Sequence, residues 1–518
     1  MNYPTFEHMS EKDRYHFLRD TLQEFSDPFC AQSILRYAAH MHQEKVALIY
    51  KDTYLTYHAL YMQVKLFARV LQAQGVRPGD IVIVCLENTP AFYVAYYAVW
   101  QLGAVVTPIN TFLTEYELAH IVDDANPSCI VTFAQKKAFF LQSSLNEEKI
   151  LVLPEVPELQ GECDNSQQMP SFTQEALAAL LYTSGTTGVA KGVMLSSKNI
   201  LTNILQSAAR LGVYKSYRIF AILPLFHVFA QNTCVWMSVL TGSTIVLVPK
   251  IDRRYLLENM KHKPTIFLGV PALYGLLCLL KTVDLSSVEL FISGGDALPD
   301  KIRSYFSLLY HRKIANGYGL TETAPVIAVD LEDYISPSGC VGRPLHGIIC
   351  SIRNDNQQEV NVGEIGQLWV KGDMVMQGYY NASQETGKVM HDGFFNTGDC
   401  AYMTKDGRLV ISGREKDLII SKGLNIYPQE IENALLSHPL VVRAGVVGKE
   451  HEEVGQVPVA FVQVTTIDVM LEKELLLICK QKLAPYKIPK QFIFQTSDLP
   501  LTATNKIDKK KLRTKIEQ

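Results

Sequence analysis

Residues 182–192 read Tyr-Thr-Ser-Gly-Thr-Thr-Gly-Val-Ala-Lys-Gly, a stretch that lies between two apolar runs, residues 176–181 and 193–195. Glycines let a backbone turn tightly and bring its N–H groups close to an anion. The Ser and Thr hydroxyls add hydrogen-bond donors, and the lysine adds a mobile positive charge. The stretch therefore predicts a phosphate-holding loop. It differs from the G-x-x-x-x-G-K-S/T loop, because two residues separate Gly188 from Lys191 and a glycine follows the lysine.

Strand-like and helix-like segments alternate on both sides of this loop. Residues 80–87 contain a β-rich run, residues 90–102 read as an apolar helix, and residues 105–109 read as the next buried strand. Short continuous apolar strands separated by helices are typical of mostly parallel, helix-covered sheets. The large N-terminal part is therefore predicted to be α/β. Similar strand-like runs recur at residues 127–133, 219–223, 243–248, 265–269 and 289–293.

The pattern changes after about residue 350. Short strands punctuated by glycine predict a small β-rich subdomain at about residues 350–412. Beyond Lys416 the pattern predicts a separate α+β unit, with helices near residues 429–437 and 471–483 and strands at residues 441–447, 457–464 and 492–495. We therefore expect a large N-terminal domain, residues 1–414, and a small C-terminal domain, residues 415–518.

Length and composition narrow the class of protein. A chain of 518 residues is too long for one hydrophobic core, so two or more domains are expected. The net charge of −3 offers no electrostatic reason to expect nucleic acid or a membrane surface as a partner. Ten cysteines without a C-x-x-C pair argue against a disulfide framework or a zinc site, and favour a reducing compartment.

Targeting signals are not expected either. Acidic residues close to the N-terminus argue against a signal or transit peptide. The longest apolar stretch, residues 235–248, is too short and too polar to cross a bilayer. The sequence therefore predicts a cytoplasmic enzyme without a transmembrane segment.

Seven further motifs follow the loop along the chain. They are Leu223-Pro-Leu-Phe-His227, Ser293-Gly-Gly295, Gly317-Tyr-Gly-Leu-Thr-Glu322, Thr397-Gly-Asp399, Gly413-Arg-Glu-Lys416, Ser421-Lys-Gly423 and Leu499-Pro-Leu-Thr-Ala-Thr-Asn-Lys506. In identity and order these motifs resemble those of the adenylate-forming enzymes, the superfamily of acyl-CoA synthetases, peptide-synthetase adenylation domains and firefly luciferase. The resemblance covers roughly residues 30 to 513.

The resemblance implies carboxylate activation, with ATP, Mg²⁺ and coenzyme A. A carboxylate attacks the α-phosphorus of ATP, pyrophosphate leaves, and a thiol then captures the acyl-adenylate. Catalysis of such a step depends mainly on alignment and on neutralisation of phosphate charge. The resemblance also implies a small C-terminal domain that pivots against the large one.

The residues implied to hold ATP and its metal belong to five motifs. They are Thr183, Ser184, Gly185, Thr186, Thr187, Gly188 and Lys191 for the β- and γ-phosphates, Gly294, Gly295, Gly317, Tyr318 and Gly319 around adenine, Thr321 at the α-phosphate, Glu322 on Mg²⁺, and Asp399 and Arg414 at the ribose. One carboxylate plus phosphate oxygens suits a hard, water-retaining ion.

Four further roles concern the acid and the pivot. By resemblance, His227 orients the carboxylate or lines the acyl entrance, and Lys506 bridges that carboxylate and the α-phosphate during adenylation. Rotation about Lys416 would withdraw Lys506 and bring the loop containing Gly423 to the thiol tunnel.

The acid is expected to be apolar. Amino-acid-activating domains need a buried acidic partner for the substrate ammonium, but residues 228–236 read Val-Phe-Ala-Gln-Asn-Thr-Cys-Val-Trp. Phe229, Ala230, residues 235–237 and residues 269–274 are either the lining of a hydrocarbon pocket or ordinary core. The first hypothesis is therefore a medium- or long-chain fatty acyl-CoA synthetase.

Three alternatives stay open. A ligase that passes the adenylate to an acyl carrier protein would carry the same motifs. A luciferase-like oxygenase would reuse the adenylation site and consume oxygen. A non-catalytic binding protein is disfavoured, because the chain retains five charged residues of the motifs: Lys191, Glu322, Asp399, Arg414 and Lys506.

Overall fold

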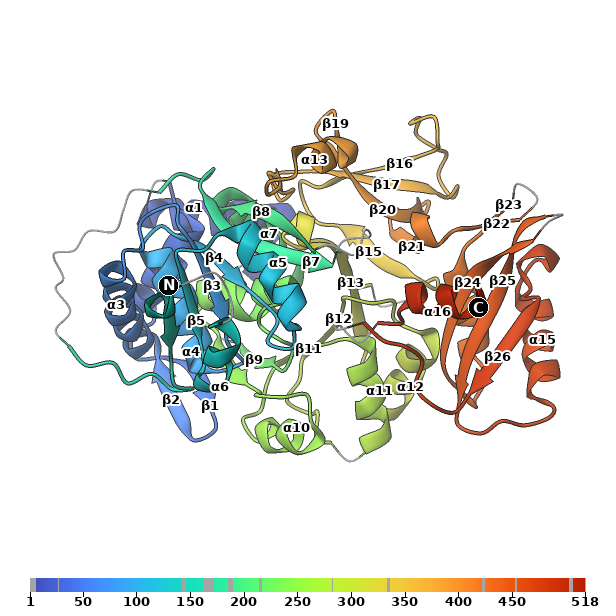
Figure 1. Cartoon of the computed structure of the whole chain (residues 1–518), viewed down its shortest axis with the longest axis horizontal. Helices are drawn as coiled ribbons and strands as arrows, with labels where there is room; N and C mark the ends of the chain where they lie inside the picture. Colours follow the sequence, from blue (N-terminus) through green and yellow to red (C-terminus); the bar gives the residue numbers. More distant parts are fainter. Residues whose placement is uncertain are drawn as a thin grey trace.

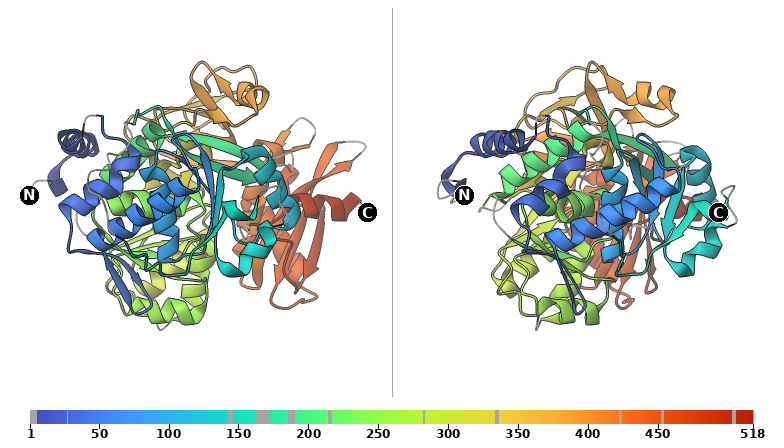
Figure 2. Two further views of the ribbon diagram at one scale, coloured as in Figure 1. Left: turned by 60° about the vertical axis from the view of Figure 1, so that its left-hand side comes forward. Right: turned by 90° about the vertical axis from the view of Figure 1, so that its left-hand side faces the viewer.

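The computed structural model describes residues 6–26, 28–141, 146–161, 172–184, 190–213, 217–281, 283–332, 336–421, 424–451, 454–502 and 506–517. The N-terminal part of the chain carries two sheets, and a third sheet at one end of the molecule is built from residues beyond Arg414 (Figure 1). In the left view of Figure 2, helix α1 (Glu11–Phe25) and helix α16 (Lys509–Glu517) lie at opposite ends. This architecture confirms the predicted α/β class.

The first sheet contains the two strands on either side of the predicted phosphate loop. Its order is β18 (Gly378–Tyr379), β8 (Ala190–Ser196), β7 (Leu177–Ser184), β4 (Val105–Pro108), β3 (Ile81–Cys85), β5 (Cys129–Thr132) and β6 (Ile150–Val152). Strands β7, β4, β3, β5 and β6 are parallel, whereas β8 runs antiparallel to β7. The predicted phosphate loop, residues 182–192, therefore begins in β7 and ends in β8.

The second sheet is longer and mixed. Its order is β16 (Ile349–Arg353), β17 (Gly366–Lys371), β20 (Phe394–Met403), β21 (Leu409–Arg414), β15 (Cys340–Pro344), β14 (Val326–Asp330), β13 (Ile314–Gly319), β12 (Leu290–Ser293), β11 (Ile266–Gly269), β9 (Arg218–Ala221), β10 (Thr244–Leu247), β1 (Val46–Tyr50) and β2 (Thr53–Thr56), with β19 (Met390–His391) beside β20. The strands from β13 to β1 are parallel, as predicted. The strands of the expected β-rich subdomain are antiparallel and join this sheet through β15 and β21.

Helices cover these sheets. They are α2 (Ile34–Met41), α3 (Tyr57–Ala73), α4 (Pro90–Gln101), α5 (Glu115–Ala125), α6 (Ala134–Phe140), α7 (Ser197–Leu211), α8 (Val228–Ala230), a π-helix (Gln231–Met237), α9 (Ser238–Leu240), α10 (Arg253–Met260), α11 (Pro271–Leu280), α12 (Asp300–Tyr310) and α13 (Ser383–Val389).

Helix α4 shows why an all-apolar helix was predicted correctly. Its residues from Pro90 to Trp100 are buried, so no polar face is needed. Its tyrosine hydroxyls find carbonyl partners on the π-helix: Tyr93 donates to Cys234 (2.8 Å) and Tyr97 donates to Val235 (2.6 Å). These bonds fix the π-helix, and with it the segment that follows His227.

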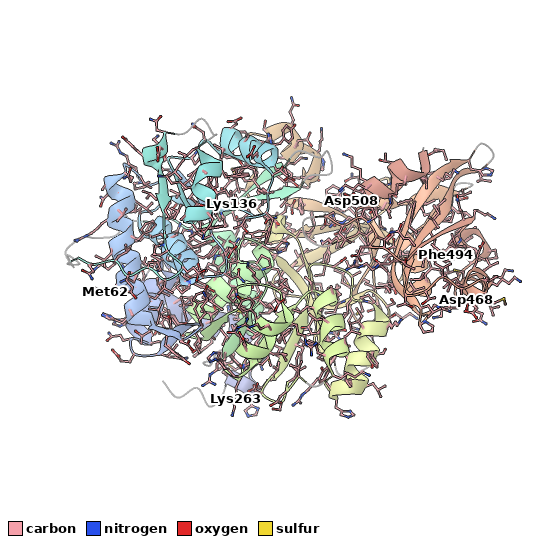
Figure 3. The ribbon with its side chains drawn as sticks, turned by 60° about the horizontal axis from the view of Figure 1, so that its bottom comes forward. Met62, Lys136, Lys263, Asp468, Phe494 and Asp508 are labelled. Atoms are coloured by element: carbon pink, nitrogen blue, oxygen red, sulfur yellow. The ribbon has the colours of Figure 1, made fainter. Side chains whose placement is uncertain are left out.

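The third sheet forms the C-terminal unit. Its order is β23 (Leu424–Ile426), β22 (Ile419–Ser421), β25 (Gly455–Val464) and β24 (Val441–His451), with β26 (Gln491–Gln495) beside β25. Helices α14 (Pro428–Leu436) and α15 (Leu471–Lys482) pack on it, together with α16. Phe494 and Asp468 lie in this unit, whereas Asp508 lies where it meets the rest of the chain (Figure 3).

The apolar cores of the two parts are separate. Among the described residues, the hydrophobic clusters of the N-terminal part end at Ile411, and those of the C-terminal unit begin at Ile419. The predicted boundary at residues 414 and 415 lies between them. A polar interface between units with separate cores is the kind that permits relative motion.

Candidate active site

The candidate site lies beyond the carboxyl ends of parallel strands. Gly294 and Gly295 follow β12, and the short 3₁₀-helix Thr321–Thr323 follows β13. Strands β20 and β21 approach from the other side and pair Asp399 with Arg414 in register. In α/β sheets this edge is where ligands bind, because strand ends and helix starts converge there.

Asp399 is the centre of a buried polar group. The Tyr318 hydroxyl donates to Asp399 Oδ2 (2.5 Å), and Arg414 Nε lies 2.8 Å from Oδ1. The Asp399 side chain is only 4% exposed. Burial raises the pKa of this carboxyl, and the charge of Arg414 opposes that rise. Both carboxylate oxygens are oriented, which suits an acceptor for two ribose hydroxyls.

Tyr318 and its flanking glycines lie on β13. The Tyr318 hydroxyl is engaged by Asp399, a contact that the sequence did not predict. A Cβ atom at Gly319 would collide with the backbone carbonyl of Pro325, so this glycine permits close packing of β13 against the chain that follows. Gly317 has more room, since its nearest neighbour would lie 3.5 Å away.

Glu322 lies beside Thr321 in the 3₁₀-helix. The hydroxyl of Tyr379 donates to Glu322 Oε1 (2.9 Å), and Met376 N donates to the Glu322 carbonyl (2.8 Å). Burial raises the pKa of the Glu322 carboxyl. No cluster of three or more His, Cys, Asp or Glu in the described part of the chain is arranged to hold a metal ion. Glu322 fits Mg²⁺ as a single protein ligand, with phosphate oxygens and water as the others.

Lys191 lies on β8, opposite Thr183 on β7. Its ammonium lies 2.9 Å from Glu385 Oε2 and 5.2 Å from the centre of the Tyr379 ring. Lys388 lies 2.5 Å from the other oxygen of Glu385, and these two lysines lower the pKa of Glu385 to about 2. The predicted loop residues Gly185, Thr186, Thr187 and Gly188 and the side chain of Ser184 lie outside the described residues.

Tyr379 and Glu385 are site residues that sequence reasoning missed. Tyr379 contacts both Lys191 and Glu322, although it lies 57 residues from Glu322 along the chain. It reaches them because β18 pairs with β8, so that Tyr379 faces Val193. No local spacing rule links these positions.

His227 caps the start of α8. Its Nδ1 accepts a hydrogen bond from Phe229 N (3.2 Å), which leaves the ring proton on Nε2. Burial and the charge of Lys506 lower the pKa of His227 to about 4, so the imidazole is neutral at pH 7. The Phe229 ring lies against Gly294, where an added Cβ atom would lie 3.1 Å from it.

Lys506 reaches this site from the C-terminal unit. The carboxylates of Asp296 and Asp399 and the cations Arg414 and Lys416 all act on its charge. Burial is the larger effect and lowers the pKa of Lys506. The charge of Lys506 therefore acts on the part of the site that contains His227, Asp399 and Arg414.

The predicted pivot lies directly beside the site. Lys416 is in the 3₁₀-helix Glu415–Asp417, and burial together with Arg414 lowers its pKa. Arg513 of α16 donates to the Lys416 carbonyl (3.3 Å) and pairs with Asp417 (2.6 Å). Gly423 lies outside the described residues.

The apolar residues near His227 divide into two groups. Val235, Trp236, Met237 and Tyr274 are fully buried in the core, and Trp236 donates to the Tyr96 hydroxyl (2.9 Å). Phe229 and Val270 are only partly buried and flank Gly294 and Gly295. In the part of the chain that the structure describes, no helix is long and apolar enough to cross a membrane.

Comparisons with known proteins agree with this geometry. Residues 35–380 match the AMP-binding enzyme family, and residues 430–506 match the AMP-binding enzyme C-terminal domain. A long-chain-fatty-acid–CoA ligase of Bacillus subtilis is 33% identical, with 93% of each chain covered. A 2-succinylbenzoate–CoA ligase of Bacillus velezensis is also 33% identical, over 92% of this chain and 96% of its own.

Solved structures show the same fold. ATP-bound MatB from Rhodopseudomonas palustris superimposes with a TM-score of 0.86 at 28% identity, covering 94% of this chain and 99% of its own. The O-succinylbenzoate Coenzyme A Synthetase of Bacillus subtilis with ATP and magnesium ion superimposes with a TM-score of 0.82 at 30% identity, covering 94% and 99%.

The chain belongs to the AMP-binding enzyme family, that is, to the adenylate-forming enzymes. The resemblance inferred from the motifs is thereby confirmed. These relatives are named as CoA ligases, and none of them supports the acyl-carrier-protein alternative.

Proposed function

We propose that this protein is an ATP-dependent acid–CoA ligase that activates a medium- or long-chain fatty acid as its acyl-adenylate. Family membership and the CoA ligases among its relatives support the ligase class. The relatives divide between fatty acids and 2-succinylbenzoate, so the choice of acid depends on the site itself.

The residues around the proposed acyl entrance favour a fatty acid as the substrate. Phe229 and Val270 flank Gly294 and Gly295, next to His227. Residues 227–240, 267–274 and 293–296 contain no lysine or arginine. A dicarboxylic acid such as 2-succinylbenzoate keeps a second charge after activation, which needs a cationic partner when buried. An alkyl chain needs only apolar contacts.

The adenylation step follows from the charges around the α-phosphate. An oxygen of the substrate carboxylate attacks the α-phosphorus, and the bond to the pyrophosphate oxygen breaks as pyrophosphate leaves. His227 donates a hydrogen bond from its Nε2–H to the carboxylate and orients it, while Lys506 neutralises charge on both reacting groups. Thr321 contacts the α-phosphate.

The other site residues hold the nucleotide. Asp399 and Arg414 hold the ribose, Tyr318 and its glycines accommodate adenine, and the residue 182–192 loop with Lys191 holds the β- and γ-phosphates. Glu322 would hold Mg²⁺, and the ion would supply further charge neutralisation at the phosphates.

The second step uses the same acyl carbon. The CoA thiolate attacks the acyl-adenylate carbonyl, and AMP leaves as the thioester forms. Because Lys506 occupies the site in the present orientation, the thiol needs the C-terminal unit to rotate about Lys416. The boundary near residues 414 and 415 and the polar interface support that rotation.

The test is pyrophosphate release from ATP with acids of two to eighteen carbons, 2-succinylbenzoate, aromatic acids and amino acids, each with and without CoA. We expect turnover with fatty acids only when CoA is present. Preference for 2-succinylbenzoate would overturn the fatty-acid assignment. A single burst of adenylate that CoA cannot discharge would overturn CoA as the acceptor.

A further inference from the structure

Lys301 lies at the interface between the two units, and its side-chain hydrogen bonds to described residues all cross that interface. Lys301 is the second residue of α12 in the N-terminal part. Its ammonium donates to three backbone carbonyls of the C-terminal unit, those of His438 (3.1 Å), Pro439 (3.3 Å) and Val441 (3.5 Å). An ammonium has three donors and no acceptor, so this set uses all of them.

The acceptor side is a rigid turn. His438 is buried, its Nε2 lies 3.0 Å from Glu474 Oε2 on α15, and its Nδ1 accepts from Leu440 N (3.3 Å). The turn joins α14 to β24 and therefore moves with the C-terminal sheet. Three carbonyls in a fixed turn converge on one ammonium in a single orientation of the unit.

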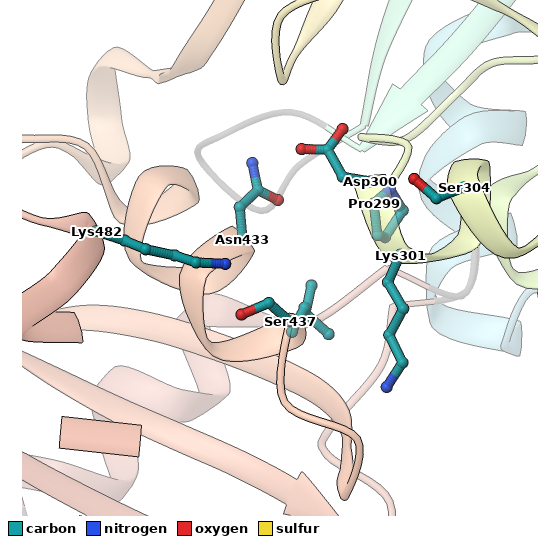
Figure 4. Close-up of a pocket in the computed structure, with 8 residues that line it drawn as sticks. Pro299, Asp300, Lys301, Ser304, Asn433, Ser437 and Lys482 are labelled. Atoms are coloured by element: carbon teal, nitrogen blue, oxygen red, sulfur yellow. The ribbon is translucent and has the colours of Figure 1, made fainter. Parts of the chain in front are cut away.

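A polar contact between side chains also joins the two units. Asn433 Nδ2 donates to Ser338 Oγ (3.0 Å), and no hydrophobic cluster among the described residues includes both units. A cleft of about 260 Å³ opens beside Lys301, and residues of both units face one another across it (Figure 4). Because no shared apolar cluster of described residues fixes the orientation of the C-terminal unit, directional hydrogen bonds from a charged donor contribute more to that orientation.

We propose that Lys301 is a positioning residue that holds the C-terminal unit in the orientation in which Lys506 enters the site. The proposal rests on the proposed two-step ligase reaction. Lys301 touches neither substrate nor reacting atoms, and it acts through the position of the whole unit. The partial burial that lowers the pKa of Lys301 is consistent with an ammonium directed into the interface.

A consequence follows for the two half-reactions. Adenylation requires the present orientation, and transfer to CoA requires the rotated one. The ratio of the two rates is therefore proportional to the equilibrium between the orientations, whichever of them predominates. Loss of the Lys301 contacts should lower this ratio, either by slowing adenylation or by speeding transfer.

The experiment compares Lys301→Met with the wild type in the full-length protein. Adenylation is measured as acid-dependent exchange of pyrophosphate into ATP, and transfer is measured from synthetic lauroyl-adenylate to CoA. We expect the ratio of adenylation to transfer to fall about tenfold, the effect of losing hydrogen bonds to a charged donor. Lys301→Arg keeps the charge and donors and should recover most of the ratio.

Lys482→Met is the matched control. Lys482 lines the same cleft from α15, and within the described residues it has no hydrogen-bond or ion-pair partner. This variant removes the same charge from the same cleft and should leave the ratio unchanged. A Lys301→Met ratio equal to that of the wild type, or an equal loss of both rates, would overturn the proposal.

A second measurement needs no substrate. In a Ser338→Cys/Asn433→Cys variant, the disulfide forms only when the units meet as they do here. Its equilibrium constant in glutathione buffer should fall when Lys301→Met is added. If the wild type performs neither half-reaction, the proposed function fails, and this disulfide equilibrium alone decides on Lys301. An unchanged equilibrium constant would then reject the positioning role.

Discussion

Replacing Lys506 by methionine removes one charge from the candidate site and keeps a side chain of similar length. In the structure the Lys506 ammonium interacts electrostatically with two carboxylates, Asp296 and Asp399, and two cations, Arg414 and Lys416. With Lys506 included, these five groups have a net charge of plus one. Lys506→Met cancels that surplus at the point where the substrate carboxylate and the α-phosphate, both negative, must approach each other.

The size of the effect follows from that loss. A unit charge about 4 Å from a developing negative charge contributes up to about 4 kcal/mol at an effective dielectric constant near 20. Removal of a single donor to a developing oxyanion typically costs about 2.7–4 kcal/mol. Adenylation by Lys506→Met should therefore fall by roughly two to three orders of magnitude. Transfer from a supplied acyl-adenylate to CoA should change little, because the ammonium is withdrawn in that step.

The thermal stability of Lys506→Met should not fall, although its rate of adenylation does. The pKa of Lys506 is lower in the folded protein than its ordinary value, so folding disfavours its charged form at every pH below that folded pKa. Methionine removes this penalty, and the variant should melt no lower than the wild type. Adenylation by the wild type should also decline on the alkaline side before an ordinary lysine would titrate.

The assays are pyrophosphate exchange, single-turnover transfer to CoA, and thermal melting of the same preparations. Equal losses in both half-reactions, with a normal melting temperature, would refute the role assigned to Lys506. A large fall in melting temperature would refute the electrostatic reasoning, since it would show that the buried ammonium stabilises the fold.

Three further outcomes are expected. Tyr379→Phe removes the hydroxyl that donates to Glu322 and should raise the KM for Mg·ATP about two- to tenfold at limiting Mg²⁺, and an unchanged KM would contradict the orienting role. Lys416→Pro restricts the backbone at the pivot, so one half-reaction should be lost far more than the other, and two intact half-reactions would exclude rotation there. Since the pKa of His227 is about 4, the rate of adenylation between pH 5 and 8 should show no imidazole titration, and a step near pH 6.5 that disappears in His227→Gln would show that burial does not keep the ring neutral.

The strands could be predicted because their side chains need only apolar neighbours. The predicted strands at residues 80–87, 105–109 and 289–293 each contain a mostly apolar run, and the structure places these runs in the largely buried strands β3, β4 and β12. Such runs can be recognised as strands from the sequence alone, because a strand in a helix-covered sheet is buried on both faces and needs only apolar neighbours. Predicted and observed bounds differ by a few residues at the ends, where strand pairing stops.

The π-helix shows why other elements could not be predicted. Gln231, Asn232 and Thr233 are buried, although their polarity favours an exposed segment. Asn232 donates to Asn203 (2.9 Å), and the Gln231 amide oxygen accepts from the Tyr96 hydroxyl (3.1 Å). These partners come from α7 and α4, so only the assembled fold shows that the polar groups are satisfied.

The candidate site likewise contains residues that the sequence identified and contacts that only the folded structure shows. Glu322, Asp399 and Arg414 lie in motifs with a recognisable local sequence, and the fold brings them to one edge of the sheet. The contacts of Tyr379 arise from strand pairing between distant segments. Short motifs identify which residues take part, whereas the hydrogen-bond partners that orient them depend on tertiary structure.

The segment around Lys506 is the clearest case of a simple interpretation that fails. A lysine close to a run of basic residues suggests a solvated tail, yet Leu499, Ile507 and Leu512 anchor the segment in an apolar cluster with β24 and β25. Backbone bonds close it further, from Thr502 N to the Lys506 carbonyl (2.8 Å) and from Asp508 N to the Pro500 carbonyl (2.8 Å).

Two of the basic residues that follow Lys506 are paired as well. Lys509 lies 2.7 Å from Glu432 on α14, and Arg513 lies 2.6 Å from Asp417 beside the pivot. The described residues on both sides of Lys506 are thus held to the C-terminal unit, so the ammonium is expected to move with that unit. Entry of this ammonium into the site is therefore decided by the contacts that orient the unit. For that reason a lysine outside the site, Lys301, is expected to control which half-reaction the site performs.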